Sequence, residues 1–334
     1  MNSIHCWWGL AMTLASTMIS YKPVKTTGKS VMASDSVKFS YQAITGIGLD
    51  SLYNRRDNSD IIKVGNRYYV WYTRMNVPVT AGYWGAIWYA TSDDEGFTWT
   101  ERGMALGRGE AGKFDSHAVF TPNILVYEGR YYLYYTGVKP TPGNPKQAFE
   151  NNSINDVTAL GLSVADTPDG PFVRVGDGPI LEISRDSSAF DSYRIDDASL
   201  LVRDQKVWLY YKGRSIAHGP KGPALTKMGV AFSDNPEGPY RKHGVPLLDK
   251  SHEVLIWTMN QGVASLASLD SFLNFAADGI HFSKLQNKMT GIPMAPGLYR
   301  PHLEGDHTRN ETPGWGIAMR ARKNVTYLVR FEMK

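Results

Sequence analysis

The sequence predicts an all-β protein, a five-bladed β-propeller with a short N-terminal extension. The first reason is an internal repeat, because residues 114–137 recur without a gap as residues 190–213. Both copies open with Phe-Asp-Ser and lead through an apolar run and a polar turn to an aromatic strand. The second reason is that each copy continues into another hairpin. Four strands per unit, repeated along the chain, are the sequence pattern of propeller blades.

Three predicted blades follow one another near residues 53–110, 114–185 and 190–250. In each, the second hairpin consists of a strand, an Asp-centred turn with Gly or Pro, and a short closing strand. Turns of this composition between β-branched and aromatic runs indicate β-hairpins.

The remaining two blades have weaker patterns. The fourth is predicted to run from His252 to Phe282, and the fifth from Tyr299 to Phe331. The fifth lacks one strand, and we expect residues near 37–41 to supply it and so to join the two ends of the ring. The predicted organisation is a signal peptide at 1–20, an N-terminal extension at 21–50, and the propeller at 51–334.

Composition agrees with one large domain and argues against two classes of partner. The 334 residues are 42% hydrophobic and 12% aromatic, enough for a substantial core. No apolar run reaches the roughly 18 residues of a membrane span. The net charge is +4, but Lys and Arg alternate with Asp and Glu, so we expect no nucleic-acid partner.

Residues 1–20 contain no Lys, Arg, Asp or Glu and carry an apolar stretch followed by small residues. This pattern predicts a secretory signal peptide, although without the usual positive start, and thus a secreted or periplasmic protein. An irregular cytosolic N-terminus is the alternative. Cys6 is the only cysteine, so the domain has neither disulfides nor thiolate metal sites.

Three acidic residues lie at the starts of predicted blades: Asp57, Asp197 and Glu253. The innermost strands of a propeller line its channel, so these carboxylates are expected to converge on one funnel. Solvated turn carboxylates are the alternative for any single one of them. Asp196 competes with Asp197, because neighbours on a strand face opposite ways. Separated carboxylates around a pocket are what glycoside hydrolysis requires.

Further residues near the strand starts are candidates for binding a sugar, because aromatic faces suit sugar rings and polar groups suit hydroxyls. Ordinary packing between blades is the alternative for each aromatic, including Trp84. The substrate-binding candidates are Arg56, Trp88, Thr121, Asn123, Arg194, Asp196 and Trp257. No cofactor is expected to be required. Carboxylates and carbonyls in the central channel leave a bound divalent cation as an open alternative.

Several motifs together resemble glycoside hydrolase family 117, the α-1,3-(3,6-anhydro)-L-galactosidases. They include RDNSDIIKV at 56–64, FDSYRIDDA at 190–198 and HEVL at 252–255, and the resemblance spans about residues 50–320. It implies a five-bladed propeller and exo-hydrolysis with inversion, releasing 3,6-anhydro-L-galactose from the non-reducing end of neoagarooligosaccharides in agar degradation.

The resemblance also implies roles for four residues. Asp57 is expected to be the general base, His252 an unusual histidine acid, and Asp197 and Glu253 the other active-site acids. A neighbouring carboxylate is expected to hold the proton on His252. Family members carry an N-terminal SxAxxR dimerisation motif, of which this chain offers only Ser34-Asp35-Ser36, so a homodimer is left open.

Two other functions remain as alternatives. One is a propeller glycosidase acting on another sugar, either arabinofuranosidase-like or directed at another galactan. The other is a carbohydrate-binding propeller without catalysis, against which the presence of Asp57, Asp197, His252 and Glu253 argues.

Overall fold

The computed structural model describes residues 37–140, 156–267, 269, 271–285, 289–301 and 314–334. Within them the regular structure is β-sheet, apart from two 3-10 segments, η1 (Gly82–Trp84) and η2 (Ile216–Leu225). The predicted all-β class is confirmed. In these same residues, no helix is long and apolar enough to cross a membrane. The predicted signal peptide and the Ser34-Asp35-Ser36 segment lie outside the described residues.

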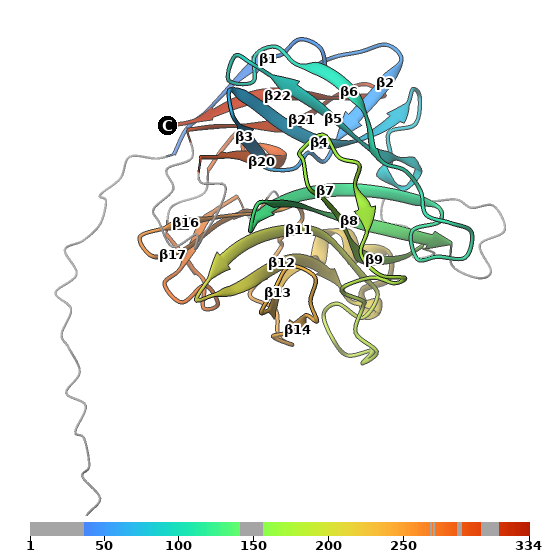
Figure 1. Ribbon diagram of the computed structural model, residues 1–334. Coiled ribbons are helices and arrows are strands. Elements are labelled where there is room, and N and C mark those ends of the chain that lie inside the picture. Colours follow the sequence, from blue (N-terminus) through green and yellow to red (C-terminus); the bar gives the residue numbers. More distant parts are fainter. Residues whose placement is uncertain (1–36, 141–155, 268, 270, 286–288, 302–313) are drawn as a thin grey trace, which may run out of the picture. The chain divides into compact units, whose positions relative to one another are not determined.

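The strands form antiparallel meanders that follow the chain (Figure 1). The first comprises β3 (Ile61–Val64), β4 (Arg67–Asn76), β5 (Ala86–Ser92) and β6 (Thr100–Leu106), with β2 (Tyr53–Arg56) paired to β4. The second comprises β7 (Ala118–Tyr127), β8 (Arg130–Pro140), β9 (Asp156–Ala165) and β10 (Val173–Arg174). The third comprises β11 (Arg194–Arg203), β12 (Lys206–Arg214), β13 (Lys227–Ser233) and β14 (Arg241–Lys242), with β15 (Leu248–Asp249) paired to β13.

The fourth meander comprises β16 (Val254–Met259), β17 (Gly262–Ala267), β18 (Leu273–Ala276) and β19 (Ser283–Lys284). The last comprises β20 (Met294–Arg300), β21 (Trp315–Arg322), β22 (Val325–Met333) and β1 (Phe39–Ala43). A short parallel pairing of β20 with β3 joins the last meander to the first. The first strand of the last meander begins at Met294, five residues before the predicted Tyr299.

The innermost strands lie side by side in a ring. Contacts run from β7 to β11, from β11 to β16, from β16 to β20 and from β20 to β3, while β4 contacts β7. This succession is that of a propeller, as the repeat predicted. The ring is closed by the two ends of the chain, because β1 pairs with β22 and Phe39 lies opposite Met333. The expectation that residues near 37–41 supply the missing strand is confirmed.

The repeated Phe-Asp-Ser segment is a packing device. Phe114 stacks on Tyr135 and Phe190 stacks on Tyr211, with ring centroids 6.0 Å apart in both cases. The adjoining aspartates accept hydrogen bonds from the same tyrosines: Tyr135 donates to Asp115 and Tyr211 to Asp191. The ring of each phenylalanine lies on strand glycines, since a Cβ on Gly137 or Gly213 would come within 2.5 Å of it.

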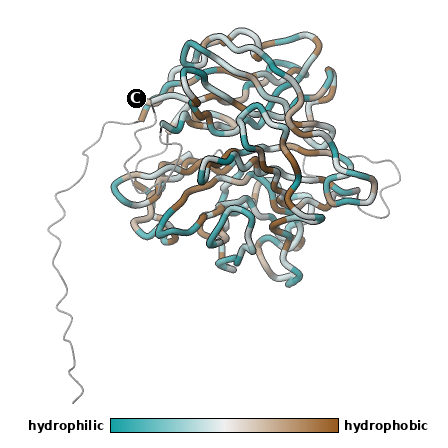
Figure 2. The backbone as a smooth tube through the Cα atoms, viewed as in Figure 1, coloured by the Kyte–Doolittle hydropathy of each residue, from teal (hydrophilic) through white to brown (hydrophobic). Residues whose placement is uncertain are grey.

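Apolar side chains fill the space between neighbouring sheets, so hydrophobic stretches follow the strands and hydrophilic ones the turns (Figure 2). Polar bonds tie the inner strands together around the channel. Asp60 accepts from the Leu298 amide at 2.8 Å and from Arg300 Nε at 3.0 Å. Asn123 accepts from the Asp60 amide and donates to the Ala198 carbonyl. These bonds fix the strand starts relative to one another.

Candidate active site

The start of the inner strand has an unusual backbone in four of the meanders. Asp57, Thr121, Asp197 and Ala295 have φ values of 47°, 46°, 54° and 42°, in the left-handed region. The register of β7, β11 and β20 shifts at these points, as in a β-bulge. Left-handed non-glycine residues carry strain and cluster at functional sites, and bulges re-aim side chains. The gapless repeat therefore aligned Thr121 with Asp197 correctly.

These strand starts converge. A small cavity of about 30 Å³ is lined by two or three residues at the start of each of five inner strands: Asp57 and Asn58, Thr121 to Asn123, Asp197 and Ala198, Glu253 and Val254, and Ala295 and Pro296. This volume suffices for about one water molecule. Asp57, Asp197 and Glu253, which the sequence assigned to one funnel, thus line one cavity in the structure.

A larger cavity of about 240 Å³ shares several of these residues. One part of its wall is charged and another is apolar. The lining residues are Arg56, Asp57, Gly82, Tyr83, Phe120, Thr121, Asp196, Asp197, Lys212, His252, Glu253, Met294 and Met319. All four predicted catalytic residues line this cavity. It combines acids with an apolar surface, which is what a sugar ring with one polar and one apolar face requires.

Asp196 and Asp197 both line the larger cavity, so the expectation that only one of them enters it is wrong. The bulge at Asp197 interrupts the alternation of the strand. Lys212 lies opposite Asp196 on β12 and reaches both carboxylates, at 3.0 Å from Asp196 Oδ1 and 2.6 Å from Asp197 Oδ2.

Asp57 has its own cationic partner. Arg56 Nε lies 2.6 Å from Asp57 Oδ2, and Arg56 Nη1 donates to the Thr80 carbonyl at 2.8 Å. The backbone of Gly82 in η1 packs against Asp57 and Phe120, since a Cβ there would lie 3.4 Å from Asp57 Oδ2. Arg56 and η1 therefore orient the Asp57 carboxylate.

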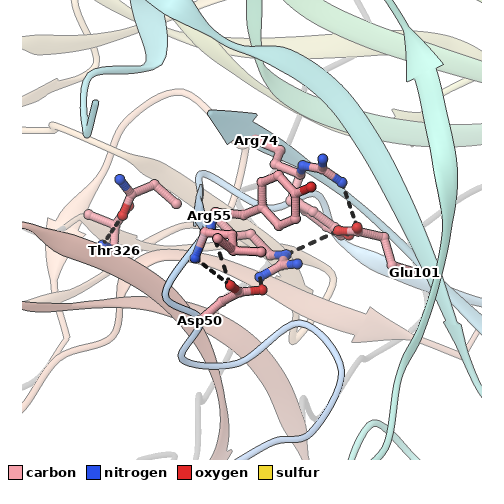
Figure 3. A network of polar contacts seen from close by, with 9 residues as sticks. Asp50, Arg55, Arg74, Glu101 and Thr326 are labelled. Atoms are coloured by element: carbon pink, nitrogen blue, oxygen red, sulfur yellow. Dashed lines mark hydrogen bonds and ion pairs between the residues drawn. The ribbon is translucent and has the colours of Figure 1, made fainter. Parts of the chain in front are cut away.

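A polar network anchors β2, which leads into Asp57 (Figure 3). Arg55 binds Asp50 and Glu101, each at 3.1 Å, and Arg74 Nη1 binds the other oxygen of Glu101 at 2.6 Å. Asn54 accepts from the Thr326 amide at the start of β22. Because neighbours on a strand point to opposite faces, fixing Arg55 in this network leaves Arg56 on the other face, and the left-handed backbone of Asp57 brings its carboxylate to Arg56.

Burial and the charges around the larger cavity raise the pKa values of one carboxyl group and one ammonium group. Burial raises the pKa of Asp197 to about 8; Lys212 opposes this shift, while Asp196, Asp57 and Glu253 add to it. Burial acts to lower the pKa of Lys212, but the carboxylates of Asp196 and Asp197 outweigh it and raise the pKa overall. Lys212 is therefore a permanent cation in this site.

Positive charges, and not a hydrogen-bonded carboxylate, dominate the surroundings of His252. Its Nε2 is 3.6 Å from Glu253 Oε1, beyond a good hydrogen bond. The positive charge of Lys212, followed by burial and the charge of Arg214, lowers the pKa of His252 to about 2. The expectation that a neighbouring carboxylate holds the proton on this histidine is corrected for the unliganded protein, in which His252 is neutral.

The structure brings some predicted binding residues to the cavities and leaves others outside. Arg56, Thr121 and Asp196 line the larger cavity, and Asn123 lines the smaller one. Trp257 does not reach either, because it is buried at 3% exposure in a core cluster with Leu255 and Leu298.

Two other candidates also lie apart from the cavity linings. The Arg74 guanidinium covers the ring of Trp88 at 3.4 Å from its centre. Arg194 is buried behind Tyr83, with its guanidinium carbon 4.7 Å from the centre of that ring. Direct substrate contact by Trp88, Arg194 and Trp257 therefore stays a prediction that these two cavity linings do not support.

Several lining residues escaped the sequence analysis, above all Lys212, Tyr83 and the pair Met294 and Met319. The sequence did contain an indication for Lys212, because the gapless repeat aligns this charged residue with the neutral Thr136. The methionines carried none, since a weak fifth repeat gave no alignment for β20.

The residues present do not fit a tightly held metal ion. Within the described part of the chain, no group of three or more His, Cys, Asp or Glu side chains is placed to hold one. Asp57 is paired with Arg56, and Asp196 and Asp197 are paired with Lys212. A divalent cation in the channel stays a prediction that these side chains do not support.

The propeller fold and a pocket of convergent carboxylates define a glycoside hydrolase. The family model described as glycosyl hydrolases family 43 matches residues 54–228, more than half of the chain, and the chain belongs to that family. Comparison with curated proteins finds no match.

The chain is also similar to a solved structure described as Zg3597, a family 117 glycoside hydrolase, produced by the marine bacterium Zobellia galactanivorans. The two are 28% identical with a TM-score of 0.76, over 89% of this chain and 90% of that one. Families 43 and 117 are related groups of propeller enzymes, and the predicted resemblance to family 117 is confirmed.

More distant structures share the fold. An endo-arabinase from Bacteroides thetaiotaomicron is 15% identical, with a TM-score of 0.54 over 86% of this chain and 97% of that one. A sucrose-6-phosphate hydrolase from Lactobacillus gasseri is 13% identical, with a TM-score of 0.62 over 88% of this chain and 61% of that one. At these identities the likeness concerns the fold alone.

Proposed function

We propose that this glycoside hydrolase is an exo-acting, inverting enzyme that cleaves the α-1,3 linkage at the non-reducing end of neoagarooligosaccharides and releases 3,6-anhydro-L-galactose. The observation that carries the proposal is the convergence of the family 117-like motifs on one cavity. RDNSDIIKV supplies Asp57, FDSYRIDDA supplies Asp197, and HEVL supplies His252 and Glu253.

Asp57 is the general base in this proposal. Its carboxylate takes a proton from a water molecule, which attacks the anomeric carbon from the face opposite the leaving group. An acid gives a proton to the glycosidic oxygen as that bond breaks. Arg56 and η1 hold the Asp57 carboxylate in one orientation, as an oriented base requires.

His252 is the proposed acid, and it must gain a proton when substrate binds. The nearby Glu253 carboxylate favours that protonation, and the proton, taken from solvent, passes to the leaving oxygen as the glycosidic bond breaks. Asp197 is the competing acid, because burial raises its pKa to about 8. In that case Glu253 and His252 bind the sugar.

The apolar wall of the cavity supports an anhydro sugar. The 3,6-ether bridge replaces two hydroxyl groups, so that part of the ring needs no hydrogen-bond partner. Tyr83, Phe120, Met294 and Met319 supply an apolar lining of this kind. A propeller glycosidase acting on arabinose or on another galactan is the alternative within the same family.

We further propose that the meanders are five blades. The support is that β3 to β6 and β20 to β1 are each complete four-stranded antiparallel units, and that the strand pairing between the two is limited to two residues, in the parallel pair of β20 with β3. Secretion or a periplasmic location rests on the composition of residues 1–20, and a homodimer rests on the family resemblance.

The test is incubation of the purified protein with neoagarobiose, neoagarotetraose and a control panel of arabinan and galactan oligosaccharides, followed by chromatography of the products. Release of 3,6-anhydro-L-galactose from the agar-derived sugars supports the proposal. Cleavage of only an arabinan or another galactan would show a glycosidase with a different substrate. Binding of these sugars without cleavage of any would show a carbohydrate-binding protein instead of an enzyme.

A further inference from the structure

Blades two and three contain the same pair of positions with different chemistry. At the bulge of β7, the Thr121 hydroxyl shares a hydrogen bond of 2.5 Å with the hydroxyl of Thr136 on β8. At the equivalent bulge of β11, Asp197 Oδ2 lies 2.6 Å from Lys212 Nζ on β12. Both pairs are buried. A neutral pair of hydroxyls thus lies at the bulge of β7, and an ion pair lies at the equivalent bulge of β11.

The bulge itself does not require the ion pair. Thr121 and Asp197 have nearly the same φ, 46° and 54°, and both strands shift register at this point. Two threonines therefore suffice for the backbone geometry. Burying a lysine and two carboxylates instead carries a large desolvation cost, which a purely structural pair would not need.

Lys212 has two carboxylates to hold. Asp196 Oδ1 lies 3.0 Å from the ammonium group in addition to Asp197 Oδ2. Without that cation, two carboxylates on adjacent residues would lie in one buried site, where they cannot both be ionised at low cost. Asp57, Glu253, Arg56, His252 and Tyr83 complete the charged and titratable groups of this cavity, and Arg214 lies near His252.

We propose that Lys212 is a positioning residue of the active site, whose ammonium group holds the Asp196 and Asp197 carboxylates together in the cavity wall beside Asp57 and Glu253. Lys212 fixes where Asp197 presents its oxygens and how many protons the pair of carboxylates carries. The kinetic part of this inference rests on the proposed function, and the stability part does not.

The test compares the wild type with Lys212→Thr and with the double variant Lys212→Thr/Asp197→Thr, which copies the hydroxyl pair of the second blade. Thr136→Val is the matched control in that blade. The melting temperature of each full-length protein is measured from pH 5 to pH 9, and kcat and KM are measured well below the melting temperature.

The Lys212→Thr protein is expected to lose thermal stability more steeply than the wild type as pH rises. Without the cation, folding traps protons on the two buried carboxylates, so the folded state binds more protons than the unfolded one and its stability falls with rising pH. The double variant removes one of these carboxylates and should melt higher than the single variant at pH 8. Thr136→Val should change the melting temperature equally at all pH values.

The kinetic expectation separates positioning from a merely structural role. Folded Lys212→Thr should have a kcat lower by roughly 10²-fold, since a misplaced catalytic group costs about that much, with a smaller change in KM. Lys212→Arg, which keeps the cation, should retain the wild-type dependence of melting temperature on pH.

Three results would overturn the inference: a Lys212→Thr curve of melting temperature against pH that parallels the wild type, a wild-type kcat in that variant, or failure of the double variant to fold. If the wild type does not cleave neoagarobiose, the proposed function is wrong, but the inference about Lys212 is not affected. The melting curves still decide the role of Lys212, and its kinetics are then measured on whichever glycoside of the panel is cleaved.

Discussion

Asp57 and Asp197 share a backbone conformation and differ in their partners. Both are left-handed residues at the start of an inner strand. Asp57 forms an ion pair with the preceding arginine, whereas Asp197 shares the Lys212 ammonium group with a second carboxylate. Two carboxyl groups in different surroundings can take different roles in one reaction, which is why the residue scale offers the sharpest tests.

Replacing Asp57 by Asn should abolish turnover while substrate binding persists. The amide keeps the shape of the side chain but cannot accept a proton from water, and a general base contributes roughly 10²–10⁴-fold. Steady-state kinetics and calorimetric titration with substrate measure the two effects. Asp93→Asn, an exposed substitution in a turn, serves as the control. Wild-type turnover in purified Asp57→Asn would remove this residue from the mechanism.

Asp197→Asn should be far more damaging to turnover than Asp196→Asn, and it should flatten the loss of stability between about pH 4 and pH 8. The pKa of Asp197, about 8, lies above the value of an unfolded Asp. Its contribution to stability therefore declines as pH rises from about 4 to about 8. Melting curves across this range, together with kcat of both variants, check the prediction. A larger kinetic loss in Asp196→Asn would assign the catalytic position to the other carboxylate.

The sequence predicted the residues that a repeat or a motif could mark. Asp57, Asp197 and Glu253 lie at matching strand starts, and His252 precedes one of them, so alignment of the repeats brought them together. The prediction that Trp88 and Trp257 contact the substrate is not supported, because aromatic residues suit a protein core as well as a sugar. Which of the two environments a tryptophan occupies depends on long-range packing that no local pattern reports.

At the scale of elements, hairpins were predictable and their irregularities were not. Alternating strands and Asp-Gly or Gly-Pro turns encode the meanders locally. A bulge inserts one residue and reverses the faces of the side chains that follow, and the rule of alternation therefore failed at Asp196 and Asp197. A bulge between Met294 and Gly297 interrupts β20 in the same way, and the predicted fifth blade began too late.

Gly161→Ala should destabilise the second meander strongly. The repeated Phe-Asp-Ser unit places aromatic rings on this glycine: an added Cβ would come within 2.4 Å of Tyr135 Cζ and 2.6 Å of Phe114 Cζ. Buried rings with no room to shift make overpacking cost about 1–3 kcal/mol or more. Thermal melting measures the loss. Gly178→Ala, where an added Cβ meets no atom within 4 Å, is the control and should melt like the wild type.

At the scale of the whole propeller, the ends of the chain complete the ring. β1 supplies the outer strand beside β22, so a segment near the start of the described chain is held by its last strand (Figure 1). The sequence predicted this closure from the number of strands, because the fifth predicted blade was one strand short. It did not predict the bonds of Asp60 and Asn123 between neighbouring inner strands, since these join residues from different blades.

Gln42→Pro should lower the melting temperature more than Ala43→Pro. Lys38 and Lys334 exchange both backbone hydrogen bonds, so in an antiparallel ladder every second pair does the same, and Gln42 opposite Arg330 belongs to that set. Proline at 42 removes a ladder bond, while proline at 43 removes an amide that points away from β22. Both side chains are exposed, so packing is matched. Equal melting of the two variants would mean that closure contributes little to stability.

In the proposed reaction, the base and the acid act on the sugar from different parts of the ring. Asp57 precedes the first inner strand and His252 precedes the fourth, so base and acid come from different blades. Inversion needs a wide separation, roughly 6.5–9.5 Å, that leaves room for water, and groups from different blades suit it. His252→Gln should lose most activity on neoagarobiose yet recover part of it on an analogue whose leaving group needs no proton. NMR of the first-formed product should show an inverted anomeric centre.

Two results would exclude this mechanism. A retained configuration in the first product would require a covalent intermediate and so a nucleophile in place of the attacking water. An equal loss of His252→Gln on natural and activated substrates would show that the histidine only binds the sugar. The acid role would then pass to Asp197, the buried carboxyl group whose pKa is raised to about 8. Asp197→Asn should in that case show the selective recovery on activated substrates that His252→Gln lacks.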